Sequence, residues 1–131
     1  MCAAVALETL NIYEQDGILE HVRAVTPHFQ ERVAELGRHP LVGEARGAGL
    51  LAAVELVADK ASREPFAPSE GVAAYAGTRA LSHGLITRAL GDTVNFCPPL
   101  IVTRAQIDEM FDAAKHALDD TLAWRKTLNN N

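Results

Sequence analysis

Arg88 is the residue of this chain whose side chain is best suited to binding a ligand. It lies in an otherwise mostly apolar stretch, residues 84–101. That stretch predicts two short strands joined by a tight turn: 85–89, 93–96, and a turn at Gly91 and Asp92. In an alternating strand Ile86, Arg88 and Leu90 share one face, so the guanidinium has apolar neighbours.

Two interpretations of Arg88 are open from the residue types alone. A guanidinium held on a rigid apolar ribbon suits bidentate recognition of a carboxylate. The alternative is an arginine on an edge strand whose charged head extends into solvent.

Other reactive residue types do not form a catalytic or metal-binding set. Cys97 precedes two prolines at a strand exit and is expected to be a small buried hydrophobic residue. Asp119 and Asp120 are adjacent on one helix and face different ways, so they are not a paired acid and base. The histidines are scattered and none pairs with cysteine or carboxylate at ligand spacing: His21, His28, His39, His83 and His116. We therefore expect no catalytic residue, no cofactor-binding residue and no metal ligand.

The segment Arg46-Gly47-Ala48-Gly49 raises the question of phosphate binding. Its Gly-x-Gly leads into a strand, so it offers no helix N-terminus to an anion. We expect the two glycines to allow a bend or bulge between strands at about residues 42–46 and 50–56.

The composition is that of a folded protein with an acidic balance. The 131 residues are 48% hydrophobic and 22% charged, which suits one domain with one core. A net charge of -5 argues against nucleic acid and against an anionic membrane as partners. No apolar run approaches the roughly 20 residues of a membrane span. Two cysteines form no disulfide framework and indicate a reducing compartment, so we expect the cytoplasm.

Four helices are expected, at residues 2–15, 18–36, 70–82 and from a capping box at 103–106. The first is apolar on most faces, which is typical of a helix buried between other elements. It begins without a capping residue, as a helix cut from a longer chain would. Pro27 should kink or split the second helix near Thr26. Ser69 is expected to cap the third, and Gly84 to end it.

The element order predicts an α+β domain, with a small, mainly antiparallel sheet of about four strands covered by helices. Two long helices precede the sheet and one long helix follows it. Residues 1–131 contain no repeat, low-complexity tract or linker, so a single domain is expected.

Several short motifs, in their order and spacing, resemble the C-terminal small domain of class III (ω-type) aminotransferases, the pyridoxal-phosphate enzymes of fold type I. Cys2-Ala3-Ala4 is similar to the start of the helix that follows the family's Gly-His-Pro segment. The other motifs cover almost the whole chain: Gly43-Glu44-Ala45-Arg46-Gly47-Ala48-Gly49-Leu50, Ala53-Val54-Glu55-Leu56-Val57, Gly84-Leu85-Ile86-Thr87-Arg88, Gly91-Asp92, Pro98-Pro99-Leu100-Ile101 and Gln106-Ile107-Asp108-Glu109.

The resemblance implies a transaminase as the parent enzyme. Such an enzyme holds pyridoxal phosphate on a lysine and moves an amino group from an amine or ω-amino acid to a keto acid such as pyruvate. It would be a homodimer, with most cofactor-binding residues in a large domain upstream of this segment. Lys60, Lys115 and Lys126 lie in a loop, the last helix and the tail, so none is a credible replacement for the cofactor lysine. The chain alone is therefore expected to be inactive and to bind no cofactor.

The resemblance also implies a role for Arg88. In the ω-transaminase subgroup the matching arginine is a mobile residue that grips the substrate carboxylate and swings out for a bulky neutral amine. The ornithine-type branch carries a carboxylate-binding arginine where this chain has Asn95. That departure disfavours ornithine-like substrates.

Two other functions stay open at this stage. One is a standalone, non-catalytic binding or interaction module with the same fold. The other is the small domain of a pyridoxal-phosphate-dependent aminomutase or decarboxylase, because the reaction is largely set by residues outside this segment.

Overall fold

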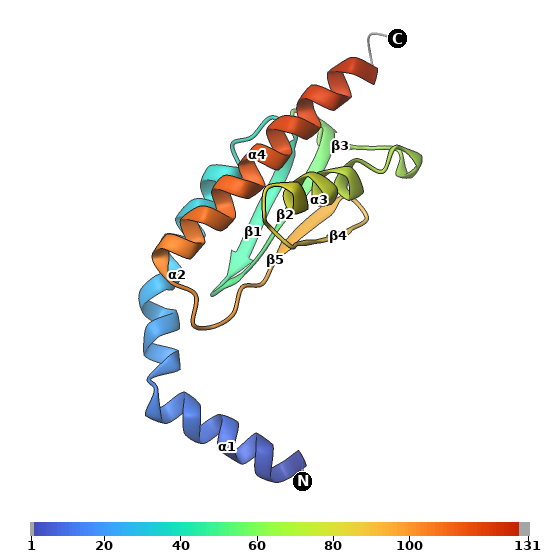
Figure 1. The fold of residues 1–131 in the computed structure, drawn as a ribbon. Helices are drawn as coiled ribbons and strands as arrows, with labels where there is room; N and C mark the ends of the chain where they lie inside the picture. The colour runs from blue at the N-terminus through green and yellow to red at the C-terminus, as the bar shows by residue number, and fades with distance from the viewer. Residues whose placement is uncertain (1, 129–131) are drawn as a thin grey trace.

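Helices cover one face of an antiparallel sheet in the computed structural model, which describes residues 2–128 (Figure 1). The helices are α1 Cys2–Gln15, α2 Ile18–Leu36, the short 3-10 helix η1 Pro68–Glu70, α3 Val72–Ser82 and α4 Arg104–Leu128. The strands are β1 Val42–Ala48, β2 Leu51–Asp59, β3 Glu64–Pro65, β4 Arg88–Leu90 and β5 Thr93–Phe96. The predicted α+β class is confirmed.

The main sheet has the strand order β1-β2-β5-β4, and the two-residue strand β3 pairs with β2. Both hairpins close through two-residue turns, since Ala48 pairs with Leu51 and Leu90 pairs with Thr93. Gly49 and Gly91 each have φ 58°, a left-handed conformation that costs glycine little. The predicted turn at Gly91 and Asp92 is confirmed. The bend predicted before residue 50 is a tight turn, and it lets β1 and β2 run longer than expected.

The core lies between the sheet and the three helices α2, α3 and α4. Phe111 of α4 occupies its centre, with ring centroids 5.3 Å from Phe29 and 5.2 Å from Phe96. Phe29 comes from α2 and Phe96 from β5, so one aromatic cluster joins two helices to the sheet. This packing fixes which face of the sheet is covered and which is left open.

The predicted bounds of α2 are confirmed, whereas the split at Pro27 and the cap of α3 need correction. α2 is not split at Pro27, because Val25 and Phe29 are buried on either side and anchor both halves to one core. Ser69 does not cap α3. It lies within η1, and Gly71, with φ 59°, leads into α3 instead. The tail predicted to fray from residue 125 is helical as far as residue 128, and 129–131 lie outside the described residues.

Helix α1 has the composition of a buried helix, but other elements of this chain do not cover it. No residue of α1 is buried, and Val5 and Leu7 are each 63% exposed. Its main neighbour is α2, and it extends away from the sheet and the other helices (Figure 1). Its apolar surface is therefore left uncovered within residues 2–128. Each helix of residues 2–128 is too short or too polar to span a membrane.

Candidate functional site

Arg88 is the first residue of β4, which is an edge strand of the sheet. The predicted alternation is confirmed: Ala89 packs against the core, whereas Ile86 is 86% and Leu90 is 65% exposed. Arg88 is exposed on that same outer face, so its apolar neighbours are on the surface and not in a buried ribbon. Within residues 2–128 its guanidinium has no hydrogen-bond or ion-pair partner. The chain by itself thus presents Arg88 to solvent, where the guanidinium is available to an anion.

Four residues form a row across the open face of the sheet. Strand pairing places Arg46 opposite Ala53, Ala53 opposite Asn95, and Asn95 opposite Arg88. Directly opposed residues point to the same side of a sheet, so all four side chains share this face. With strands about 4.8 Å apart, the two arginines at its ends are roughly 14 Å apart.

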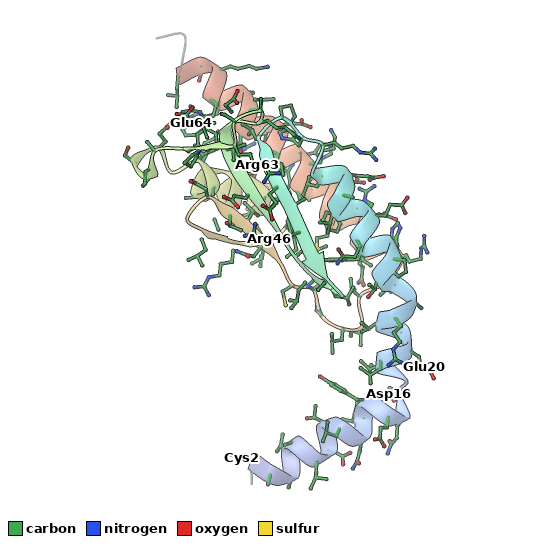
Figure 2. The ribbon with its side chains drawn as sticks, turned by 180° about the vertical axis from the view of Figure 1, so that it is seen from behind. Cys2, Asp16, Glu20, Arg46, Arg63 and Glu64 are labelled. Carbon is green, nitrogen blue, oxygen red and sulfur yellow. The ribbon has the colours of Figure 1, made fainter. Side chains whose placement is uncertain are left out.

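A shallow hollow of about 510 Å³ lies over the same face. Arg46 and Asn95 line it together with Cys97. Figure 2 views the molecule from this side, with Arg46 lying over the sheet and the helices behind it. The open face next to Arg88 is therefore accessible, with a mainly apolar hollow beside the polar side chains of the row.

The two arginines of the row differ in their electrostatic surroundings. Nη1 of Arg46 lies 3.1 Å from a carboxylate oxygen of Glu55 and 3.5 Å from one of Glu44. These acids neutralise Arg46 and hold its side chain. Arg88 has no such acidic partner among the described residues. An incoming carboxylate would therefore meet Arg88 without displacing an internal ion pair.

Two side-chain hydrogen bonds fix the backbone at Arg88. Nδ2 of Asn95 donates to the carbonyl oxygen of Arg88 at 3.1 Å. Oγ1 of Thr87 donates to the carbonyl oxygen of Asn95 at 2.5 Å. Sequence reasoning considered Asn95 only as a departure from the ornithine-type branch and missed this contact. The two-residue turn at Gly91 was the available signal, because it sets Asn95 opposite Arg88.

The prediction for Cys97 is wrong, since its side chain is exposed. Phe96 points into the core, so alternation turns the next residue to the open face. The predictions for the aspartates are confirmed: Asp119 contacts His39 and Lys115, whereas Asp120 contacts Arg79 and His83.

The histidines take part in pairwise contacts across the helices and do not form a metal site. Four have a hydrogen-bond partner far away in the sequence: His21 with the carbonyl of Val102, His28 with Asp108, His39 with Asp119, and His83 with Asp120. Within residues 2–128 no group of three or more His, Cys, Asp or Glu side chains could hold a metal ion.

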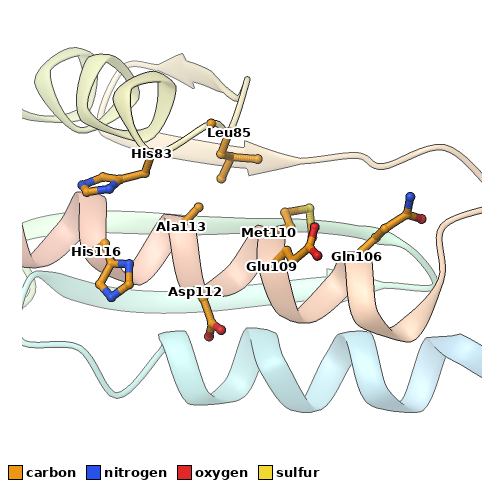
Figure 3. Close-up of a pocket in the computed structure, with 9 residues that line it drawn as sticks. His83, Leu85, Gln106, Glu109, Met110, Asp112, Ala113 and His116 are labelled. Atoms are coloured by element: carbon orange, nitrogen blue, oxygen red, sulfur yellow. The ribbon is translucent and has the colours of Figure 1, made fainter.

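A second hollow, of about 600 Å³, lies between the end of α3 and helix α4 (Figure 3). Its lining includes His83, Asp112 and His116. His83 is bonded to Asp120, and Asp112, which points from α4 toward the neighbouring helix α2, is bonded to Arg32. His83 and Asp112 are thus directed to partners outside the hollow and not toward each other.

A profile of the family described as Aminotransferase class-III matches residues 1–118. The chain belongs to the class III aminotransferase family. This class III chain is 47% identical over 124 residues to a putrescine–pyruvate aminotransferase of Pseudomonas aeruginosa, covering 94% of the chain and 27% of that relative. It is 42% identical over 118 residues to gamma aminobutyrate transaminase 3, chloroplastic, of Solanum lycopersicum, covering 90% and 23%.

Solved structures of the family share its fold. The class III chain matches a PMP-bound aminotransferase of Vibrio fluvialis with a TM-score of 0.87 and 42% identity, over 92% of its own length and 26% of that chain. It thus spans about a quarter of the length of the relatives that it matches. The resemblance seen in the short sequence motifs is confirmed.

The lysines of this class III chain do not fit a pyridoxal-phosphate site. Nζ of Lys60 donates to the carbonyl oxygens of Gly37 at 2.8 Å and His39 at 2.9 Å. Nζ of Lys115 lies 2.9 Å from a carboxylate oxygen of Asp119. Lys126 lies in the last turn of α4. Among residues 2–128, no lysine belongs to the row that ends at Arg46 and Arg88, and none lines the hollow over the open face of the sheet.

Proposed function

We propose that this chain is the C-terminal small domain of a larger pyridoxal-phosphate-dependent transaminase. That enzyme would transfer an amino group between an amine or ω-amino acid and a keto acid such as pyruvate. Membership of the class III family supports the reaction type. The similarity to a putrescine–pyruvate aminotransferase and to a gamma aminobutyrate transaminase supports the two substrate classes.

The observation that carries this proposal is the state of Arg88. Its guanidinium is exposed and has no partner within residues 2–128, while its backbone is held by Asn95. A planar guanidinium binds a carboxylate through two parallel hydrogen bonds, which fixes the orientation of a keto or amino acid. Because the side chain has no internal partner, it is free to move aside when the substrate is a neutral amine.

The rest of the enzyme would supply what this domain lacks. Pyridoxal phosphate provides the electron sink for amino transfer when it is bound. Its lysine and phosphate ligands would come from a large domain of the same polypeptide, because Lys60 and Lys115 are engaged elsewhere. The apolar surface of α1 is uncovered, and we propose that the large domain and the second subunit of a homodimer cover it.

We further propose a cytoplasmic location, which two unpaired cysteines favour.

An aminomutase, a decarboxylase and a non-catalytic module are weaker candidates. An aminomutase or decarboxylase would share the small domain. However, the relatives described above are aminotransferases or transaminases by name, which favours amino transfer. An isolated binding module would not require an unpaired arginine beside an open hollow.

The test is a comparison of two amino acceptors in the complete, cofactor-loaded enzyme. Arg88→Ala should lower kcat/KM for pyruvate by about 10- to 100-fold, the loss expected for a charged hydrogen-bonded pair. A neutral aldehyde acceptor should change by no more than about twofold, since it has no carboxylate for Arg88 to bind.

Arg46→Ala is the matched control, because it removes the same charge from the other end of the row. It should not alter the ratio of the two kcat/KM values. Equal losses with pyruvate and the aldehyde in Arg88→Ala would refute the role of Arg88.

A further inference from the structure

We propose that Asn95 is a positioning residue for substrate recognition. Together with Thr87 it holds the backbone of Arg88, and thereby sets how well the enzyme selects acceptors that carry a carboxylate. The inference rests on the proposed function, since it concerns the arginine that would bind the substrate.

Asn95 and Thr87 each make one hydrogen bond that holds the backbone at Arg88, and we call these two residues the clamp. Asn95 donates from its side-chain amide to the carbonyl of Arg88, and Thr87 donates from its hydroxyl to the carbonyl of Asn95. The two bonds run in opposite directions between β4 and β5. They therefore connect both sides of Arg88 to the strand that lies next to it.

The position of Arg88 in the sheet makes such a clamp necessary. β4 has only three residues and pairs with β5 alone, because it is the edge of the sheet. Arg88 is at the end of β4 that is far from the closing turn, and residues 85–87 before it have no regular structure. Short edge segments open locally at low free-energy cost. The backbone of Arg88 would shift more readily without the side chains of Thr87 and Asn95.

Backbone position decides how well a guanidinium grips its ligand. Bidentate binding requires the guanidinium and the carboxylate to be coplanar and at hydrogen-bond distance. A displacement of about 1 Å at a substrate-binding group can lower the rate by about 100-fold. Asn95 fixes the backbone and leaves the guanidinium without an internal partner. Arg88 can then leave the substrate site and return to the same position.

The two clamp residues allow matched substitutions. Asn95→Leu keeps a side chain of similar size and removes the amide donor. Thr87→Val keeps the shape of threonine and removes the hydroxyl, whereas Thr87→Ser keeps the hydroxyl. In the complete, cofactor-loaded enzyme we expect Asn95→Leu and Thr87→Val to lower kcat/KM for pyruvate by about 3- to 10-fold, mainly through a higher KM.

A neutral aldehyde acceptor should change by less than about twofold in both variants, because it does not contact Arg88. Thr87→Ser should retain the kcat/KM of the unmodified enzyme for pyruvate. In the Arg88→Ala background, Asn95→Leu should cause no further loss with pyruvate, since the residue that it positions is gone. If Asn95→Leu does not fold, the Thr87→Val and Thr87→Ser pair carries the same comparison.

Three results would overturn the inference: an equal loss with pyruvate and the aldehyde, no loss with pyruvate, or equal behaviour of Thr87→Val and Thr87→Ser. Arg88→Ala separates this inference from the proposed function. If that variant discriminates between the acceptors and the clamp variants do not, only the positioning role of Asn95 is wrong. If Arg88→Ala does not discriminate either, the proposed function fails and the inference fails with it.

Discussion

The imidazole of His39 lies 3.3 Å from the carboxylate of Asp119, so the turn after α2 is joined to helix α4. The backbone N–H of Leu41 donates to Nδ1 of His39 at 3.2 Å, which makes Nδ1 an acceptor. The hydrogen of this neutral ring is therefore on Nε2, facing Asp119. The buried ring thus completes both contacts in its uncharged form.

Burial lowers the pKa of His39 below its usual 6.5, and this effect outweighs the opposing influence of Asp119. Lys115 and Lys60 lower the same pKa. Because the unfolded chain binds the proton more readily, stability should be complete above about pH 6.5. It should fall as the pH decreases through 6.5 toward the lower pKa of the folded state. Denaturant unfolding between pH 8 and pH 5 measures this loss.

His39→Gln should reduce the pH dependence of the unfolding free energy over this interval, although the variant is less stable overall. His116→Gln removes an exposed histidine from α4 and serves as the control. An unchanged slope in His39→Gln would show that the histidine does not couple protonation to folding.

Much of the fold was predictable because its local signals agree with its packing. The hairpin turn at Gly91, the alternation around Arg88 and the capping box at Thr103 each act within a few residues. Oγ1 of Thr103 accepts from the N–H of Gln106 at 3.3 Å, as the capping-box pattern requires. Such signals do not depend on distant parts of the chain.

The predictions that failed concern residues whose surroundings depend on distant parts of the chain or on surfaces outside it. The apolar sequence of α1 indicates burial, but no element of residues 2–128 covers it. Cys97 was placed by residue type, whereas its side of the sheet is set by Phe96. The contact of Asn95 with Arg88 needed the register of two strands, which sequence alone indicated only through the turn.

Two glycines should respond in opposite directions to alanine. A Cβ at Gly47 would lie 2.7 Å from the carbonyl oxygen of Leu51 and 2.8 Å from the side chain of Gln30. Because backbone cannot move aside cheaply, Gly47→Ala should destabilise the domain by about 1–3 kcal/mol. A Cβ at Gly77, within α3, would meet only Ala89 at 3.7 Å, an ordinary contact. Gly77→Ala should stabilise by about 0.5–1 kcal/mol through helix propensity.

Thermal unfolding followed by circular dichroism measures both changes. We expect Tm to fall in Gly47→Ala and to rise in Gly77→Ala, by about 4 °C per kcal/mol for a chain of this size. A shift of the same sign in both variants would contradict the packing described for one of the two positions.

The uncovered helix α1 should make the isolated 131-residue chain associate with itself. Leu7 is 63% and Leu10 is 59% exposed, and they lie three residues apart on one side of α1. Burying Leu7 and Leu10 of both copies contributes about 8 kcal/mol, which exceeds the lowest estimate of the entropic cost of association, about 4 kcal/mol, by only about 4 kcal/mol. We therefore expect a dissociation constant of roughly millimolar order. Sedimentation velocity over a range of concentrations should show a growing fraction of dimer or larger species.

The combined substitution Leu7→Glu and Leu10→Glu should abolish this association, because charged side chains on both copies would be desolvated at the interface. Leu128→Glu is the matched control: it replaces an exposed leucine, 48% accessible, at the far end of α4. Its sedimentation should equal that of the unmodified chain. If the unmodified chain stays monomeric at millimolar concentration, the apolar surface of α1 does not drive association.

In the complete enzyme Leu7 and Leu10 should be protected from solvent, so hydrogen exchange in α1 should be slower there than in the isolated chain.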